Sequence, residues 1–365
     1  MRIAVIHHSN DTSNDYAAYV STLLDNTAAE NNYTVKDYHQ VSLTKEHLTD
    51  ENLLLHIVIP ATGGFLLKYW YSVKLPSVFK KYNINKALCL YGIATNAAIE
   101  QLILFHDIFL LQPNKKMLPW QQFAAKRLKK STATVQHVIT YSHHAKELFE
   151  NANGANPQKT ILLPYTVSEA FKPLEWHDKL YIKSRFAENK EFFVAVLPGD
   201  DEKTFTELLK AFSKFKKWQQ SSMQLILLPK EEGFSAAIEE KLDSYKYKDD
   251  VKLVNEADKK ETADLMASAY ALLHIAGSDA DLLAVTAALQ SATPVIAFYT
   301  ESLYEYCGDA GILIKEPGYE ALGNELIQLY KNETLRGSMS EAAAKKSELF
   351  QQKKHAENLW QLLNA

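Results

Sequence analysis

The stretch from residue 269 to 298, AYALLHIAGSDADLLAVTAALQSATPVIAF, constrains the fold more than any other part of the chain. Its apolar run over 271–275 predicts a buried strand, and the polar residues 277–281 predict a turn. Helix formers follow over 282–290, and a second strand is predicted over 293–298. Strand, helix and strand in this order are typical of a parallel sheet. Because ligands of such sheets bind where strands end and helices begin, this turn is the first candidate for a binding site.

The same alternation recurs along the chain, which at 365 residues is long enough for two domains. Further strands are predicted over 2–7, 33–39, 53–60, 87–91, 136–141, 160–164, 192–197, 223–228, 251–254 and 311–314. Helices are predicted over 16–28, 75–82, 120–130, 142–151, 202–219, 234–245, 260–268, 320–330 and 338–364. Residues 165–190 mix proline, charge and aromatic residues, which indicates a linker. We therefore expect an α/β protein with two Rossmann-like, doubly wound domains that face a cleft.

The domain boundaries follow from the linker. The first domain is expected over 1–168 and the second over 169–344. A helix over about 345–365 is expected to pack back on the first domain.

Composition excludes several classes of function. The net charge of −4 and the lack of a long basic run argue against a nucleic-acid partner. No apolar run is long enough to span a membrane, and the first residues, MRIAVIHHS, predict a strand rather than a signal peptide. Cys89 and Cys307 have no C-x-x-C spacing, which indicates a reducing compartment. We expect a cytoplasmic protein that is not transmembrane and holds no metal, since no His or Cys residues have ligand spacing.

Two surface features have alternative interpretations. Lysine clusters over 126–130, 214–217 and 345–354 lie on predicted amphipathic helices. They are either solvated faces or contacts to an acidic membrane surface or acceptor. The aromatic stretch FLLKYWY over 65–71 is either an acceptor platform or a helix-packing face, and the packing interpretation is favoured.

Several segments, in a fixed order, resemble one protein family. They are WYSVKLPSVFKKYNINKALCLYG, LILFHDIFLL, VITYSHHAKELF, LLPYTVSEAFKPL, FVAVLPGDDEKTFTELLKAFSKF, ATPVIAF and YCGDAGILI. Together they resemble the retaining GT-B glycosyltransferases of family 4 (group 1). The resemblance implies a nucleotide-sugar donor, a glycan or lipid-linked acceptor, hexosyl transfer with retained anomeric configuration and no metal. It covers most of the chain.

The resemblance also assigns a donor site around the opening segment. Aligned on 293–296, TPVI, the first Glu of the family's Glu-x7-Glu motif falls on Asp279 and the second on Ala287. The first family Glu lies beside the transferred sugar, and the second accepts hydrogen bonds from the nucleotide ribose, which Ala287 cannot do. Asp281 competes with Asp279 for the first role. Alternatively, Ser278 and the aspartates only cap the following helix.

The family's Arg and Lys at the start of a helix in the second domain fall on Glu202 and Lys203. Lys203 keeps the positive charge that faces the leaving diphosphate. Glu202 reverses it, at roughly 3 kcal/mol per unit charge for ~5 Å and an effective dielectric constant of ~20. The alternative is that the acidic residues of PGDDEK only stabilise the helix dipole. The family's "H-D" histidine, near the transferred sugar, falls on His106, for which a purely structural role is the alternative.

Two functions stay open at this point. The chain is either a glycosyltransferase with an altered donor site or a catalytically inactive pseudo-glycosyltransferase that acts as a binding or regulatory partner. A peripheral membrane surface or a protein is then a further partner. Another type of Rossmann-like enzyme is disfavoured, because no G-x-G-x-x-G follows the first strand of either domain.

Overall fold

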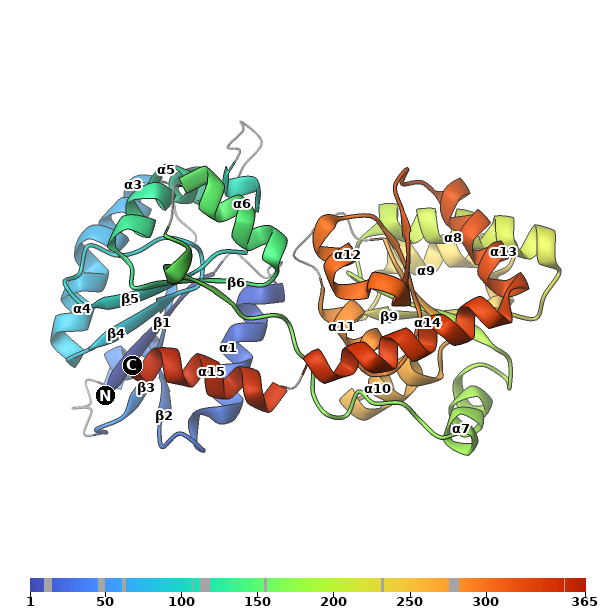
Figure 1. Cartoon of the computed structure of the whole chain (residues 1–365), viewed down its shortest axis with the longest axis horizontal. Helices are drawn as coiled ribbons and strands as arrows, with labels where there is room; N and C mark the ends of the chain where they lie inside the picture. The colour runs from blue at the N-terminus through green and yellow to red at the C-terminus, as the bar shows by residue number, and fades with distance from the viewer. Residues whose placement is uncertain are drawn as a thin grey trace. The chain divides into compact units, whose positions relative to one another are not determined.

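The computed structural model describes residues 1–9, 15–44, 50–60, 64–106, 108–111, 119–153, 156–230, 233–275, 282–350 and 352–365. It divides into two compact units (Figure 1). The N-terminal unit comprises Met1–Tyr165 and Lys353–Ala365, and the C-terminal unit comprises Thr166–Gln352. Within the described residues, each unit contains one parallel sheet, of seven and six strands respectively. The prediction of an α/β protein with two such sheets is confirmed.

The N-terminal sheet has the strand order β2-β3-β1-β4-β5-β6-β7. Its strands are β1 (Arg2–His8), β2 (Thr34–Asp37), β3 (Leu53–Ile59), β4 (Lys86–Cys89), β5 (Glu100–Leu104), β6 (His137–Thr140) and β7 (Thr160–Leu162). Its helices are α1 (Asp15–Ala28), α2 (Tyr38–Thr44), α3 (Gly64–Tyr69), α4 (Leu75–Tyr82), α5 (Pro119–Thr134), α6 (His143–Asn153) and α15 (Gln352–Asn364). A π-helical turn, η1 (Trp70–Lys74), joins α3 to α4. Short 3-10 turns lie at η2 (Ile108–Leu111) and η3 (Pro157–Lys159).

The C-terminal sheet has the strand order β10-β9-β8-β11-β12-β13. Its strands are β8 (Phe192–Leu197), β9 (Gln224–Pro229), β10 (Val251–Leu253), β11 (Ala271–His274), β12 (Val295–Phe298) and β13 (Gly311–Ile314). Its helices are α7 (Trp176–Phe186), α8 (Glu202–Gln219), α9 (Ala236–Asp243), α10 (Lys259–Ser268), α11 (Leu283–Gln290), α12 (Glu301–Cys307), α13 (Tyr319–Lys331) and α14 (Glu333–Lys346).

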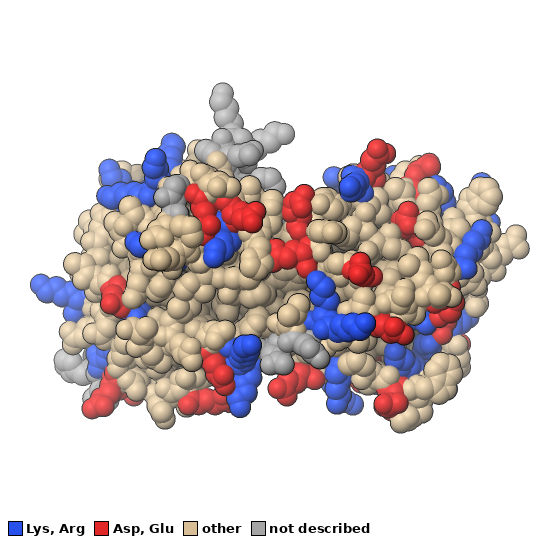
Figure 2. Space-filling view, in the orientation of Figure 1, with Lys and Arg blue, Asp and Glu red and all other residues tan. Residues whose placement is uncertain are grey.

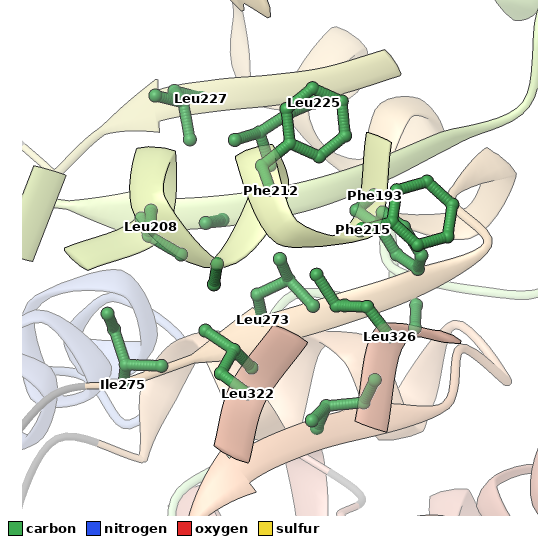
Figure 3. Close-up of a cluster of buried hydrophobic side chains, with 14 of the residues drawn as sticks. Phe193, Leu208, Phe212, Phe215, Leu225, Leu227, Leu273, Ile275, Leu322 and Leu326 are labelled. Carbon is green, nitrogen blue, oxygen red and sulfur yellow. The ribbon is translucent and has the colours of Figure 1, made fainter. Parts of the chain in front are cut away.

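A single apolar cluster fills one side of the C-terminal sheet (Figure 3). Phe193 and Leu225 from the strands meet Phe212 and Phe215 from α8, and Leu326 from α13 closes the cluster. The apolar residues of α8 recur every three to four positions, so they form one face that must be covered. Burying each such side chain contributes roughly 1.5–3 kcal/mol. This cluster therefore fixes α8, and with it the residues at the start of α8.

The last helix, α15, packs on the N-terminal unit. The Trp360 indole Nε1 donates to Thr27 Oγ1 of α1 at 2.8 Å. The Tyr33 hydroxyl donates to Asn364 Oδ1 at 2.8 Å, and the rings of Tyr33 and Trp360 lie 4.7 Å apart. Two buried aromatic residues with satisfied polar atoms make a strong attachment.

The structure corrects three element predictions. The strand predicted over 33–39 ends at Asp37, because the Asp37 carboxylate accepts from the His39 backbone N–H and starts α2. The linker predicted over 165–190 contains the helix α7. The single helix predicted over 338–364 is two helices, and the first begins at Glu333, after Asn332 Oδ1 accepts from the Leu335 N–H at 3.0 Å. None of the helices in the described part of the chain has the length and apolarity needed to cross a bilayer.

Candidate functional site

The carboxyl ends of β8 and β9 form a tightly closed edge of the C-terminal sheet. A Cβ atom on Gly199 would lie 1.9 Å from the carbonyl oxygen of Gly233, so the loops after the two strands touch through backbone alone. The Ser235 N–H donates to the Gly199 carbonyl at 2.9 Å, and the Phe234 N–H donates to Asn255 Oδ1 at 3.0 Å. This edge positions the start of α8, where ligands of parallel sheets bind.

The first turn of α8 carries the predicted residues Glu202 and Lys203, and both are exposed. Asp201 is the N-cap, and its carboxylate accepts from the Thr204 N–H at 3.0 Å. The alternative interpretation that the acidic residues stabilise this helix therefore applies to Asp201. Glu202 has a different contact, because its carboxylate lies 2.5 Å from Lys241 Nζ of α9. Its negative charge is thus locally compensated.

Two cationic residues at this edge were missed by sequence reasoning. Lys241 is distant from Glu202 in the sequence, and no local pattern indicates their pairing. Lys230 directly follows β9 and is half-buried, and its backbone N–H donates to the Leu197 carbonyl at the end of β8. Its position after the buried run QLILLP was the available signal. Lys203 and Lys230 thus add two cationic residues to an edge that also carries the carboxylates of Asp200 and Asp201.

The predicted residues around α11 are only partly described. Ser278, Asp279 and Asp281 lie outside the described residues. Ala287 lies within α11 and is buried, so its side chain has no hydrogen-bond acceptor and little surface that a ligand can contact. His274, which ends β11 at the same edge of the sheet, is buried as well. Sequence reasoning did not single out His274, although it lies within the strand predicted over 271–275.

His106 follows β5 in the N-terminal unit and is buried. Burial lowers the pKa of His106 to about 3, so the imidazole stays neutral at physiological pH. The ring of Tyr91 lies 5.7 Å away and nearly perpendicular to it. His106 is therefore a neutral polar group and not a cation, and it has a hydrogen bond to the Leu90 backbone. Asp107, the second residue of the predicted "H-D" pair, lies outside the described residues.

The structure adds His8 to this neighbourhood. His8 Nε2 lies 2.7 Å from the Tyr71 hydroxyl, and the rings of His8 and Tyr91 lie 4.6 Å apart. Burial, with a smaller effect of His7, lowers the pKa of His8 to about 4. The carboxyl ends of β1, β4 and β5, together with Tyr71 of η1, thus bring two neutral imidazoles and two phenols together. Sequence reasoning considered the histidines other than His106 only for metal-ligand spacing, so it did not single out His8.

Metal binding finds no support in the described part of the chain. No three His, Cys, Asp or Glu side chains in the described ranges lie close enough together to hold a metal ion. Cys89 and Cys307 are free and buried, and burial raises the pKa of each thiol to about 12. Neither thiol is therefore a thiolate ligand or nucleophile at physiological pH.

Comparisons with known proteins agree with this architecture. Residues 178–346 match the family model described as "Glycosyl transferases group 1". A search of curated protein sequences finds no match to the chain.

Three solved structures resemble the chain over its whole length. A sucrose-phosphate synthase from Thermosynechococcus elongatus has a TM-score of 0.73 and 16% identity, and covers 100% of this chain and 98% of its own. A glycosyltransferase from Rickettsia africae has a TM-score of 0.69 and 12% identity, with 99% and 97% covered. Anabaena Alr3699/HepE, solved in complex with UDP and glucose, has a TM-score of 0.70 and 13% identity, with 100% of both chains covered. At these identities, the similarity is one of fold.

Proposed function

We propose, from the premise that the C-terminal unit is a group 1 glycosyltransferase domain within a GT-B fold, that this protein is a glycosyltransferase with an atypical donor site. It uses a nucleoside diphosphate sugar and transfers the hexosyl group with retained anomeric configuration to a glycan or lipid-linked acceptor. The nucleotide binds at the carboxyl edge of the C-terminal sheet. No metal takes part. A cytoplasmic location remains a prediction from the sequence.

The ion pair between Glu202 and Lys241 is the observation that carries this proposal. A carboxylate alone at position 202 would repel a diphosphate, and this was the main objection to transfer activity. Because Lys241 Nζ lies 2.5 Å from the Glu202 carboxylate, the pair adds little net charge. Lys203, on the same turn, is then the exposed cation that contacts the leaving diphosphate, and Lys230 lies at the end of β9, so the cations at this edge balance the carboxylates of Asp200 and Asp201.

The other assignments follow the family resemblance. Asp279 is proposed beside the transferred sugar, with Ser278 and Asp281 on the same turn, and His106 is proposed near the sugar as a neutral hydrogen-bonding group. A uridine nucleotide is the first donor to test, since HepE was solved with UDP and glucose.

The second candidate function is that of a pseudo-glycosyltransferase that binds or regulates an active enzyme. Ala287 favours it, because a buried methyl group replaces the carboxylate that holds the ribose in the family. An active enzyme must then hold the ribose with some other group, whereas a pseudoenzyme needs only the packing that Ala287 provides.

Donor turnover separates the two functions. The protein is incubated with UDP-glucose and with other sugar nucleotides, with and without a chelator, and the anomeric protons of donor and product are followed by NMR. Retained configuration, unaffected by the chelator, is expected. Lys203→Ala and His106→Ala are each expected to lower the rate, whereas Lys217→Ala, at the other end of α8, should not. An inverted product or loss of activity with the chelator would contradict the mechanism, and no turnover with any donor would favour the pseudoenzyme.

A further inference from the structure

One face of the N-terminal unit carries apolar side chains that its own core does not use. Phe65, Leu66, Tyr69 and Val73, on α3 and η1, are 83%, 49%, 47% and 52% exposed. They recur at helical spacing, so they form one stripe along the helix. The opposite side of the same segment packs into the core, where Leu67 and Tyr71 are buried. The packing interpretation of 65–71 thus holds for Leu67 and Tyr71 and is wrong for Phe65, Leu66 and Tyr69.

The surroundings of this stripe are basic. Lys68 lies within the stripe, and Lys74 follows it on η1. Helix α5 packs against α3, and the rings of Tyr71 and Phe123 lie 6.0 Å apart. Exposed on α5 are Lys126, Lys129 and Lys130. In Figure 2 the Lys and Arg side chains gather over the region of α3 and α5. We call the stripe and these lysines the basic ridge.

The part of the sequence that contains the basic ridge has far more basic than acidic residues. Between residues 52 and 146 there are twelve Lys and Arg residues, and the only acidic residues are Glu100 and Asp107. Neither α3, η1, α4 nor α5 contains an acidic residue. The whole chain, by contrast, has a net charge of −4. A charge asymmetry of this size indicates an anionic partner for one face.

A cavity of about 400 Å³ borders the basic ridge. It is lined by the loop 94–99 and by Arg127, Lys130 and Ser131. The Asn96 N–H donates to the Tyr71 carbonyl at 3.0 Å, which connects this loop to the ridge helix, and Asn96 Oδ1 accepts from Arg127 at 2.9 Å. Cationic side chains around a recess beside an apolar stripe suit a phosphate group attached to an apolar chain.

We propose that the basic ridge docks the N-terminal unit on an anionic lipid bilayer. Phe65, Leu66, Tyr69 and Val73 enter the boundary between headgroups and acyl chains, as the apolar face of an interfacial helix does. The lysines face the lipid phosphates, each contributing about fivefold to binding near an anionic surface. Acidic proteins and nucleic acids would engage the lysines equally well but leave the large exposed aromatic and aliphatic side chains in water. The apolar stripe therefore favours lipid.

Vesicle flotation tests this proposal and needs no turnover, so its result is independent of the proposed transferase activity. The full chain is mixed with vesicles of phosphatidylcholine alone or with phosphatidylglycerol, and the floating fraction is measured. Binding to the anionic vesicles and its loss at high salt are expected. The double variant Phe65→Ser/Leu66→Ser should bind about tenfold more weakly or worse. The triple variant Lys126→Gln/Lys129→Gln/Lys130→Gln should show a loss of similar size or larger.

Control variants lose exposed apolar or lysine side chains outside the ridge. Trp218→Ser removes a side chain of α8 that is 70% exposed, and Lys217→Gln/Lys345→Gln/Lys354→Gln removes three exposed lysines. Both controls should float like the wild type, and circular dichroism checks that every variant is folded. Equal binding to neutral vesicles, no binding at all, or unchanged flotation of Phe65→Ser/Leu66→Ser would overturn the proposal. Binding to polyglutamate or DNA that matches the binding to vesicles and survives that double substitution would assign the ridge to an acidic macromolecule instead.

Discussion

Both units are built on a parallel sheet, but the carboxyl edges of the two sheets have opposite chemistry. In the N-terminal unit, β1, β4 and β5 end in buried rings, among them His8, Tyr91 and His106. In the C-terminal unit, β8 ends in an exposed helical turn where Glu202 is paired with Lys241. The polar rings at the N-terminal edge are buried away from water, whereas the charged side chains at the C-terminal edge are exposed to water.

This difference teaches that a shared architecture does not fix how a site acts. Burial keeps the imidazoles of His8 and His106 neutral, so they contribute packing and hydrogen bonds but no charge. The first turn of α8 acts through exposed charged side chains. These interact with an anionic ligand but contribute little to the stability of the fold. The N-terminal edge should therefore respond to pH, and the C-terminal edge to charge substitutions.

The largest expected effect is the loss of stability when a core side chain of one unit is truncated. Phe193→Ala, in the apolar cluster of the C-terminal unit, should lower the unfolding free energy of that unit by about 3–5 kcal/mol. Hydrogen exchange should increase in β8 and β11 and stay unchanged in β1 and β5. Phe105→Ala, in the N-terminal unit, is the matched control and should produce the reverse pattern. Equal loss of protection in both units after either substitution would show that the two cores are not independent.

Acid should destabilise the N-terminal unit by an amount comparable to the effect of Phe193→Ala on the C-terminal unit. Burial lowers the pKa of His7 and His8 to about 4 and of His106 to about 3, below the ordinary value near 6.5. The unfolded chain therefore binds protons that the folded chain does not, so stability is complete above pH 6.5 and falls as the pH drops toward 4. Between pH 6.5 and 5 each histidine accounts for about 2 kcal/mol.

Urea unfolding at pH 7 and pH 5, followed by hydrogen exchange in β1 and β5, measures this loss. His7→Gln, at the half-buried end of β1, should remove about 2 kcal/mol of it. An N-terminal unit that is equally stable at both pH values would refute the assignment of neutral, buried imidazoles.

A smaller effect is expected from restoring a cation to the C-terminal edge. Glu202→Arg should tighten UDP binding about tenfold, because it replaces a negative charge with a positive one beside Lys203. Glu202→Gln should give part of this gain. Calorimetric titration of UDP into the three proteins measures it. Identical affinities would mean that the start of α8 does not face the nucleotide.

The smallest effect tests the ion pair itself. Lys241→Gln should change the unfolding free energy by less than about 1 kcal/mol, because the pair is partly exposed. It should nevertheless weaken UDP binding, since Glu202 then faces the diphosphate unpaired. A large loss of stability with unchanged UDP binding would make the pair a structural contact only.

The sequence predicted most of the framework because its signals are local. The bounds of β8, β13, α4 and α8 agree with the predicted ranges, since apolar periodicity and helix caps lie within each segment. The start of α2 was missed because one side chain, Asp37, redirects the backbone at the end of a run that also fits a strand. Helix α7 was missed because it lies in a segment of mixed composition.

The candidate site could be predicted only in part, because its chemistry depends on contacts between distant residues. Glu202 was recognised from its position, but its partner Lys241 lies on another helix, and the pairing compensates the charge of Glu202. His106 was recognised from its sequence neighbours, whereas its neutral state results from burial by several strands. The motif around Asp279 stays a prediction, because it lies outside the described residues.

Nucleotide binding tests the central claim most directly. UDP, GDP, ADP and TDP are titrated by calorimetry into the wild type, Lys203→Ala and the control Lys217→Ala. One nucleotide is expected to bind the wild type and the control equally and to bind Lys203→Ala about tenfold more weakly, because a charge-assisted contact to phosphate is lost. No heat with any nucleotide, or equal binding by Lys203→Ala, would contradict the proposal that the carboxyl edge of the C-terminal sheet is a working donor site.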